Sequence, residues 1–257
     1  MRRTDLRRTA VAAVAAASLT LLVGACAADK PAAHAPAAGA PAKPEEAAAK
    51  ALSAAELEKA ALAEGDLSTH MVKNGTKADE VPDGAVKTDK AECKPLGDAM
   101  AAIPMGKPAA HVLRKAVEKP AKMKVDPNAS AEEKAKAGIA AMTQPVTADR
   151  LASYEGKGAQ EAFAALSKAG QACGGGFTGD QAGEKVKITK VLADTVTGGD
   201  EAQGWTLTMD GDGTEVVMKL AAVREGSTLA TFYTISLGGT VKAQPAGVID
   251  AQVKKLG

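Results

Sequence analysis

Aromatic side chains are scarce in this sequence, which has one Trp, two Tyr and three Phe among 257 residues. Large apolar side chains contribute most of the free energy gained by burial. We therefore expect one modest core, with substantial parts of the chain outside it. Histidine is scarce as well, with three residues. This scarcity counts against an enzyme that relies on His for acid–base chemistry.

The chain also lacks an excess of charge of either sign, since its formal net charge is +1. No run of basic residues interleaves with aromatic residues, so we exclude nucleic-acid binding. The sequence has no HExxH motif, no Walker loop, no paired Cys-x-x-Cys motifs and no GxSxG motif. We therefore expect a protein that is not an enzyme and that uses neither a cofactor nor a metal ion.

The first 25 residues have the layout of a secretory signal, with a basic start followed by the uncharged stretch Thr9–Ala25. The segment Val23-Gly24-Ala25-Cys26 resembles the bacterial lipobox. This resemblance implies diacylglyceryl transfer to the Cys26 thiol and cleavage before Cys26. Two alternatives are a transmembrane helix from Thr9, which is short and alanine-rich for a bilayer, and an incidental thiol after an ordinary signal. We expect a lipid anchor on Cys26 that holds the protein at the outer face of the cytoplasmic membrane.

Residues 26–51 are rich in alanine and proline, with prolines at positions 31, 36, 41 and 44. Such a composition does not bury enough apolar surface to offset the entropy of ordering, so we expect a disordered tether. About 24 residues at ~3.1 Å each would span roughly 70 Å. We expect the remaining residues, 52–257, to form a single folded domain.

Alternation of apolar and polar residues predicts strands at 111–118 and near 147–156. Further strands follow one another in the C-terminal half, at 185–193, 202–209, 214–224 and 228–236. Asp210–Gly213 reads DGDG, which is typical of a hairpin turn. As a calcium loop it would need ligands over twelve residues and a helix on each side, whereas its flanks alternate as strands. The C-terminal half therefore predicts an antiparallel meander.

Four helices are predicted around this sheet. The first begins at the capping box Ser53–Glu56 and runs to Glu64, and the second lies near residues 94–103. An amphipathic helix covers 158–173, and a last one follows Pro245. We interpret residues 104–145 as a surface insertion. The elements together indicate an α+β fold in which helices pack on one face of an antiparallel sheet.

If Cys26 is acylated, Cys93 and Cys173 remain, and outside the membrane they can pair. A disulfide that closes a loop of ~80 residues would stabilise the fold by roughly 4 kcal/mol on the chain-entropy model. The alternative is two buried free thiols. Trp205 is a weak candidate for a ligand site, although a lone Trp on a strand is more often part of the core.

Several segments resemble a group of lipoproteins from high-GC Gram-positive bacteria, which are in turn similar to the extracellular sensor domain of the PknH-like receptor Ser/Thr kinases. The resemblance rests on LSAAELEKAALAEGDL, AECKPLGDAM, ASYEGKGAQEAFAALSKAGQACGGGF and VREGSTLATF. It implies an antiparallel sheet with helices, disulfide bonding and an extracellular ligand. This chain has one candidate disulfide where the kinase sensor has two, and it lacks a kinase domain. Signalling through an attached kinase is therefore not carried over.

These observations predict a lipid-anchored extracytoplasmic protein with a non-enzymatic, sensor-like domain. Its expected partners are the membrane, through Cys26, and an unidentified small molecule, cell-wall fragment or envelope protein. The alternative is a structural or protein-interaction module of the cell envelope without a small-molecule site. A concave apolar pocket on the sheet would favour the first reading, and an exposed apolar patch without a pocket the second.

Overall fold

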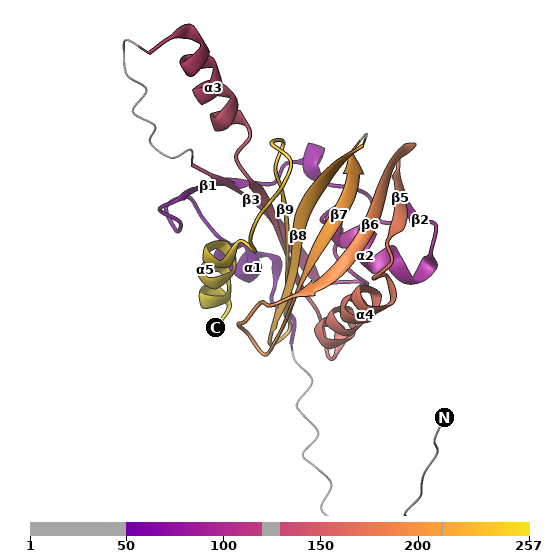
Figure 1. Cartoon of the computed structure of the whole chain (residues 1–257). Helices are drawn as coiled ribbons and strands as arrows, with labels where there is room; N and C mark the ends of the chain where they lie inside the picture. The colour runs from indigo at the N-terminus through magenta and orange to yellow at the C-terminus, as the bar shows by residue number, and fades with distance from the viewer. Residues whose placement is uncertain (1–49, 120–128, 212) are drawn as a thin grey trace, which may run out of the picture. The chain divides into compact units, whose positions relative to one another are not determined.

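The computed structural model describes residues 50–119, 129–211 and 213–257. The fold of these residues is built on a nine-stranded antiparallel sheet. The order of strands across the sheet is β1-β3-β4-β9-β8-β7-β6-β5-β2 (Figure 1). The strands are β1 (His70–Asn74), β2 (Val86–Thr88), β3 (Ala110–Glu118), β4 (Val146–Ser153), β5 (Phe177–Gln181), β6 (Glu184–Asp194), β7 (Glu201–Gly211), β8 (Thr214–Glu225) and β9 (Thr228–Ile235). All neighbouring strands pair in antiparallel register.

Five α-helices and two single-turn helices, η1 and η2, accompany the sheet within the described residues. They are α1 (Ala54–Ala60), η1 (Lys77–Asp79), η2 (Ala91–Cys93), α2 (Lys94–Met100), α3 (Ala131–Met142), α4 (Gly158–Ala172) and α5 (Ala246–Leu256). The residues from Lys50 onward form one compact unit. The predicted α+β class, with an antiparallel sheet in a single domain, is confirmed. The predicted signal peptide (1–25), Cys26 and almost all of the predicted tether (26–51) lie outside the described residues.

The helices cover both faces of the sheet, whereas the sequence led us to expect them on one face. In Figure 1, α1 and α5 lie on one side and α2 and α4 on the other. Consecutive residues of one strand separate into two cores because side chains alternate along a strand. Leu220 packs in the core under α2 and α4, and Ala221 packs in the core under α1 and α5. Periodicity predicted each helix but carried no information on which face it would cover.

Local signals explain where several helices begin. Ser53 and Glu56 form the predicted capping box of α1, and Ser130 forms an equivalent box with Glu133 at the start of α3. Helix α1 ends at Ala60, four residues before the predicted end at Glu64. Within residues 104–145, which we interpreted as an insertion, the chain contributes β3 to the sheet before it continues to α3. Helix α3 extends away from the sheet in Figure 1.

Trp205 lies in the core between β7 and α4. Its side chain is 2% exposed, and a side chain at Gly170 of α4 would overlap its indole ring. Position 170 therefore has to be glycine for α4 to pack this closely on the sheet. This placement assigns the only tryptophan to the core, as the sequence favoured, and Trp205 is not among the residues that line the pockets described below.

Candidate functional site

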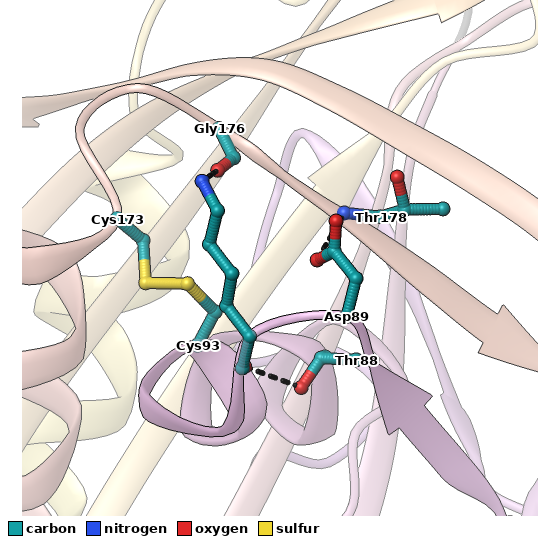
Figure 2. Close-up of a disulfide and its surroundings, with 7 residues drawn as sticks. Thr88, Asp89, Cys93, Cys173, Gly176 and Thr178 are labelled. Carbon is teal, nitrogen blue, oxygen red and sulfur yellow. Dashed lines mark hydrogen bonds between the residues drawn. A yellow bond between two sulfur atoms is a disulfide. The ribbon is translucent and has the colours of Figure 1, made fainter.

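A disulfide joins Cys93 to Cys173, which is the predicted pairing (Figure 2). Cys93 is the N-cap of α2 and Cys173 is the C-cap of α4. The bond links positions 80 residues apart in the sequence, and the Cα atoms lie 5.8 Å apart. Both residues are 0% exposed. A disulfide so completely buried holds the two helices together and is closed to reductants in solution.

Hydrogen bonds beside the disulfide fix the segment before α2 to the start of β5. The Asp89 carboxylate accepts a hydrogen bond from the Thr178 backbone N–H at 2.8 Å, and the Asp89 N–H donates to the Thr178 carbonyl at 3.0 Å (Figure 2). The Lys90 ammonium donates to the Gly176 carbonyl at 2.6 Å. Helix α2 has only seven residues, so these bonds and the disulfide determine its position against the sheet.

A pocket of about 280 Å³ lies between α2 and the sheet. Small-molecule sites usually have volumes of ~300–1,000 Å³, so this pocket is at the small end. Strands β2, β5, β6, β7 and β9 supply the opposite wall. The wall is mostly apolar, and its apolar side chains are Val86, Met100, Phe177, Val186, Ile188, Met209, Tyr233 and Ile235.

Two glycines shape the pocket wall. A Cβ atom at Gly97 of α2 would lie 3.1 Å from side-chain atoms of Val86 and Thr88, so glycine allows α2 to approach β2 closely. A Cβ atom at Gly179 of β5 would meet only the Val186 carbonyl oxygen, at 3.9 Å. The absence of a side chain at Gly179 therefore leaves open the space in front of β5, which a larger residue would fill.

The exposed end of the pocket is formed by the β5–β6 hairpin. Gln181 and Glu184 flank its two-residue turn and pair with each other across it. Both turn residues have positive φ, at 55° for Ala182 and 92° for Gly183, as type I′ turns require. Asp180 also borders the pocket, but its carboxylate accepts a hydrogen bond from the Gly183 N–H at 2.9 Å.

Two wider depressions have walls of mixed polar and apolar residues, and some of their charged groups are already in ion pairs. One lies between α2 and α4 and contains the Lys94–Asp98 pair at 2.6 Å. Burial is the main cause that raises the pKa of Asp98, and Lys94 opposes the rise. The other is bordered by Glu80 and His111, which both contact the buried Arg150 guanidinium. Polar groups already paired with each other offer a ligand less than the apolar pocket does.

Asp149 of β4 is a buried carboxylate outside these pockets. It is 0% exposed, and neither carboxylate oxygen has a hydrogen-bond partner among the described residues. Arg114 lies opposite it on β3, but that guanidinium donates instead to the Leu62 carbonyl and to Glu58. Burial raises the pKa of Asp149 to about 8, although Arg114 and Arg150 oppose the shift. None of the three pockets described above is lined by Asp149, so we consider this residue for its effect on stability.

The pocket residues were not identified from the sequence. Strands β2 and β5 escaped prediction because they are short and carry Lys, Gly and Asp in place of a regular apolar alternation. Phe177, directly after the triple glycine, was the available signal for β5. Among the described residues, no three His, Cys, Asp or Glu side chains gather as a metal site would require. In the same part of the chain, no helix is both long and apolar enough to span a bilayer.

Comparison with known proteins finds similarity among solved structures. No family model matches the chain, and no curated protein matches it. Among solved structures, the crystal structure of the extracellular domain of PknH from Mycobacterium tuberculosis is similar, with 12% sequence identity and a TM-score of 0.49. The match covers 80% of this chain and 97% of that domain.

Proposed function

We propose that this chain is a lipid-anchored extracytoplasmic protein, attached through Cys26, whose folded domain binds a small apolar ligand without transforming it. The observation that carries the proposal is the apolar pocket between α2 and the sheet. Burial of apolar surface there would supply the binding free energy, at ~25 cal/mol per Å². A pocket that opens to solvent and has a mostly apolar wall is the usual form of a small-molecule site.

The buried disulfide supports both parts of the proposal. Disulfides persist in oxidising surroundings outside the cytoplasm, which agrees with export of the chain. Cys93 caps the helix that forms one pocket wall, so the bond holds that wall in place before a ligand arrives. A wall that is already ordered lowers the entropy cost of binding.

A fluorescence titration tests the binding site. The chain from residue 26 with Cys26→Ser is titrated with N-phenyl-1-naphthylamine, a neutral apolar dye whose emission rises in apolar surroundings. We expect saturable binding. Gly179→Leu should weaken it more than about tenfold, because the leucine side chain would occupy space that the dye rings need, and apolar contact worth ~25 cal/mol per Å² is lost with the displaced area. Thr178→Val, on the opposite face of the same strand, should leave binding unchanged.

The alternative function, an interaction module of the envelope, is favoured by two exposed apolar side chains. Leu237 is 86% exposed and Ile139 is 60% exposed. If the dye does not bind, or if Gly179→Leu binds it as well as the unsubstituted domain, the proposed small-molecule site is wrong. The interaction module is then the better-supported function. The anchor is tested separately by incorporation of a labelled fatty acid into the full chain, which Cys26→Ser should abolish.

A further inference from the structure

We infer that the ligand of this pocket is a small amphiphile with an apolar body and an uncharged or cationic head, and that anionic ligands are disfavoured. The inference rests on the proposed function, because it concerns the same pocket. Three features support it: the size of the pocket and the flexible side chains of its wall, the Glu184 carboxylate at the exposed end, and the placement of the nearby lysines.

The wall fits an apolar body of modest size. Met100 and Met209 contribute flexible thioether chains, which adapt to irregular shapes, and Phe177 and Tyr233 add flat surfaces. The Tyr233 hydroxyl donates to the Met218 sulfur at 2.8 Å, so it is already used within the protein. A volume of about 280 Å³ leaves room for one short chain or a compact ring system and excludes a two-chain lipid.

The exposed end of the pocket carries negative charge. Glu184 lies on the pocket face of β6, in line with Val186 and Ile188. Its carboxylate has no hydrogen bond or ion pair with any residue in 50–119, 129–211 and 213–257. The Gln181 amide beside it can both donate and accept hydrogen bonds. A head group that reaches this end therefore meets the negative charge of Glu184 and the neutral Gln181 amide, and the Asp180 carboxylate nearby adds to the negative charge.

The lysines near the pocket do not neutralise the negative charge of Glu184 at its exposed end. Lys185 and Lys187 alternate with Val186 along β6, so their side chains project from the opposite face of the sheet. Lys90 and Lys94 lie closer to α2, but they are occupied by the Gly176 carbonyl and by Asp98. No basic side chain lines the pocket among the described residues. An anionic head would meet the negative charge of Glu184 there without gaining a cation, which is unfavourable.

Two dyes that share an aromatic body test the exclusion of anions. N-phenyl-1-naphthylamine is neutral, and 8-anilino-1-naphthalenesulfonate adds one sulfonate to the same skeleton. We expect the sulfonate to bind about three- to tenfold more weakly, since two unit charges about 4 Å apart in water repel each other by ~1 kcal/mol, which is roughly fivefold in affinity. Glu184→Gln keeps the side-chain shape and removes the charge, so it should abolish most of this difference. Glu215→Gln, on β8 and on the opposite face, is the matched control and should not change it.

Competition with a pair of single-chain amphiphiles tests the preference for a cationic head. Decyltrimethylammonium and decanoate are compared, below their micellar concentrations, for displacement of N-phenyl-1-naphthylamine. We expect the ammonium compound to displace the dye at a severalfold lower concentration, and Glu184→Gln to remove that advantage. The same displacement experiment on Gly179→Leu measures how much of the dye signal comes from sites other than the pocket.

The outcomes separate this inference from the proposed function. If the neutral dye binds through the pocket but the sulfonate binds equally well, or decanoate competes as well as the ammonium compound, the head-group inference is wrong and the pocket stands. If neither decyl compound displaces the dye, the inference is likewise wrong. If the neutral dye itself does not bind, the proposed function is wrong. A charge preference that persists in Glu184→Gln would show that another group causes it, which also overturns the assignment.

Discussion

Asp149 is the residue whose chemistry is most altered by the fold. Burial raises its pKa to about 8 from an ordinary value of 3.8. The folded state therefore keeps this proton over a range in which the unfolded state has released it. The contribution of Asp149 to the free energy of unfolding is complete below about pH 4 and is lost as the pH rises through about 8. The loss is at most ~1.4 kcal/mol per pH unit.

The Asp149→Asn variant should show this effect. Asparagine does not ionise, so the free energy of unfolding should fall less between about pH 5 and about pH 8 in the variant than in the unsubstituted protein. Urea unfolding at several pH values measures the difference. Burial lowers the pKa of His70, which gives a stability change of opposite sign through the same range. That contribution is common to both proteins and cancels in the comparison. Equal slopes would mean that Asp149 is ionised in the folded protein throughout.

The sequence predicted the role of some individual residues and not of others. Cys93 and Cys173 were predicted to pair because the compartment allowed it and no third thiol competed. For Trp205 the sequence favoured the core but did not show its contact with Gly170, which lies 35 residues earlier on another element. Glu184 carried no signal of its own, since its position at the pocket follows only from the register of β5 with β6.

At the scale of elements, the disulfide holds α2 in place. Replacing both Cys93 and Cys173 by alanine should lower the free energy of unfolding by roughly 4 kcal/mol, because the loop between them has 80 residues. Affinity for N-phenyl-1-naphthylamine should fall too, since α2 forms one pocket wall. Urea unfolding and dye titration measure the two effects. In the control, a reductant added to the folded protein without urea should leave the dye affinity unchanged, because both residues are 0% exposed. Rapid loss of binding on reduction would contradict this view of the bond.

The turn between β5 and β6 offers a stabilising substitution. Ala182 has φ 55°, a left-handed conformation that costs a residue with a Cβ atom ~1–2 kcal/mol. Asparagine tolerates this region and is favoured in type I′ turns, so Ala182→Asn should raise the melting temperature by a few degrees. Gly183→Ala is the converse, because φ 92° suits glycine, and it should lower the melting temperature. Calorimetry of the two variants checks both directions, and a destabilised Ala182→Asn would refute the turn assignment.

Long and regular elements were predictable and short ones were not. Strands β6 to β9 and helix α4 carry enough residues for their periodicity to be recognised, and a capping box marked the start of α1. Strand β2 has three residues and β5 has five, and neither shows a regular apolar alternation. These short strands form much of the pocket wall together with α2. The pocket therefore could not be predicted, since it depends on pairing between segments about 90 residues apart in the sequence.

At the scale of the whole molecule, the pocket and the entry of the chain lie at opposite ends of the sheet. The Leu52 N–H donates to the Ser153 hydroxyl at 2.9 Å, and Ser153 pairs with Thr228 at the start of β9. The pocket instead includes Ile235, at the end of β9. Seven steps of ~3.3 Å along this strand separate the two ends by roughly 23 Å.

This separation predicts that ligand binding is independent of the residues before the domain. A chain that begins at Lys50 should bind N-phenyl-1-naphthylamine within about twofold of the chain from residue 26 with Cys26→Ser. The reason is that the pocket wall comes from β2, β5, β6, β7, β9 and α2, which all lie within the shorter chain. Parallel titrations of the two proteins measure it. A clear loss of affinity in the shorter chain, with unchanged melting temperature, would show that residues 26–49 contribute to the pocket. The ligand would then be held by both the domain and the segment that precedes it.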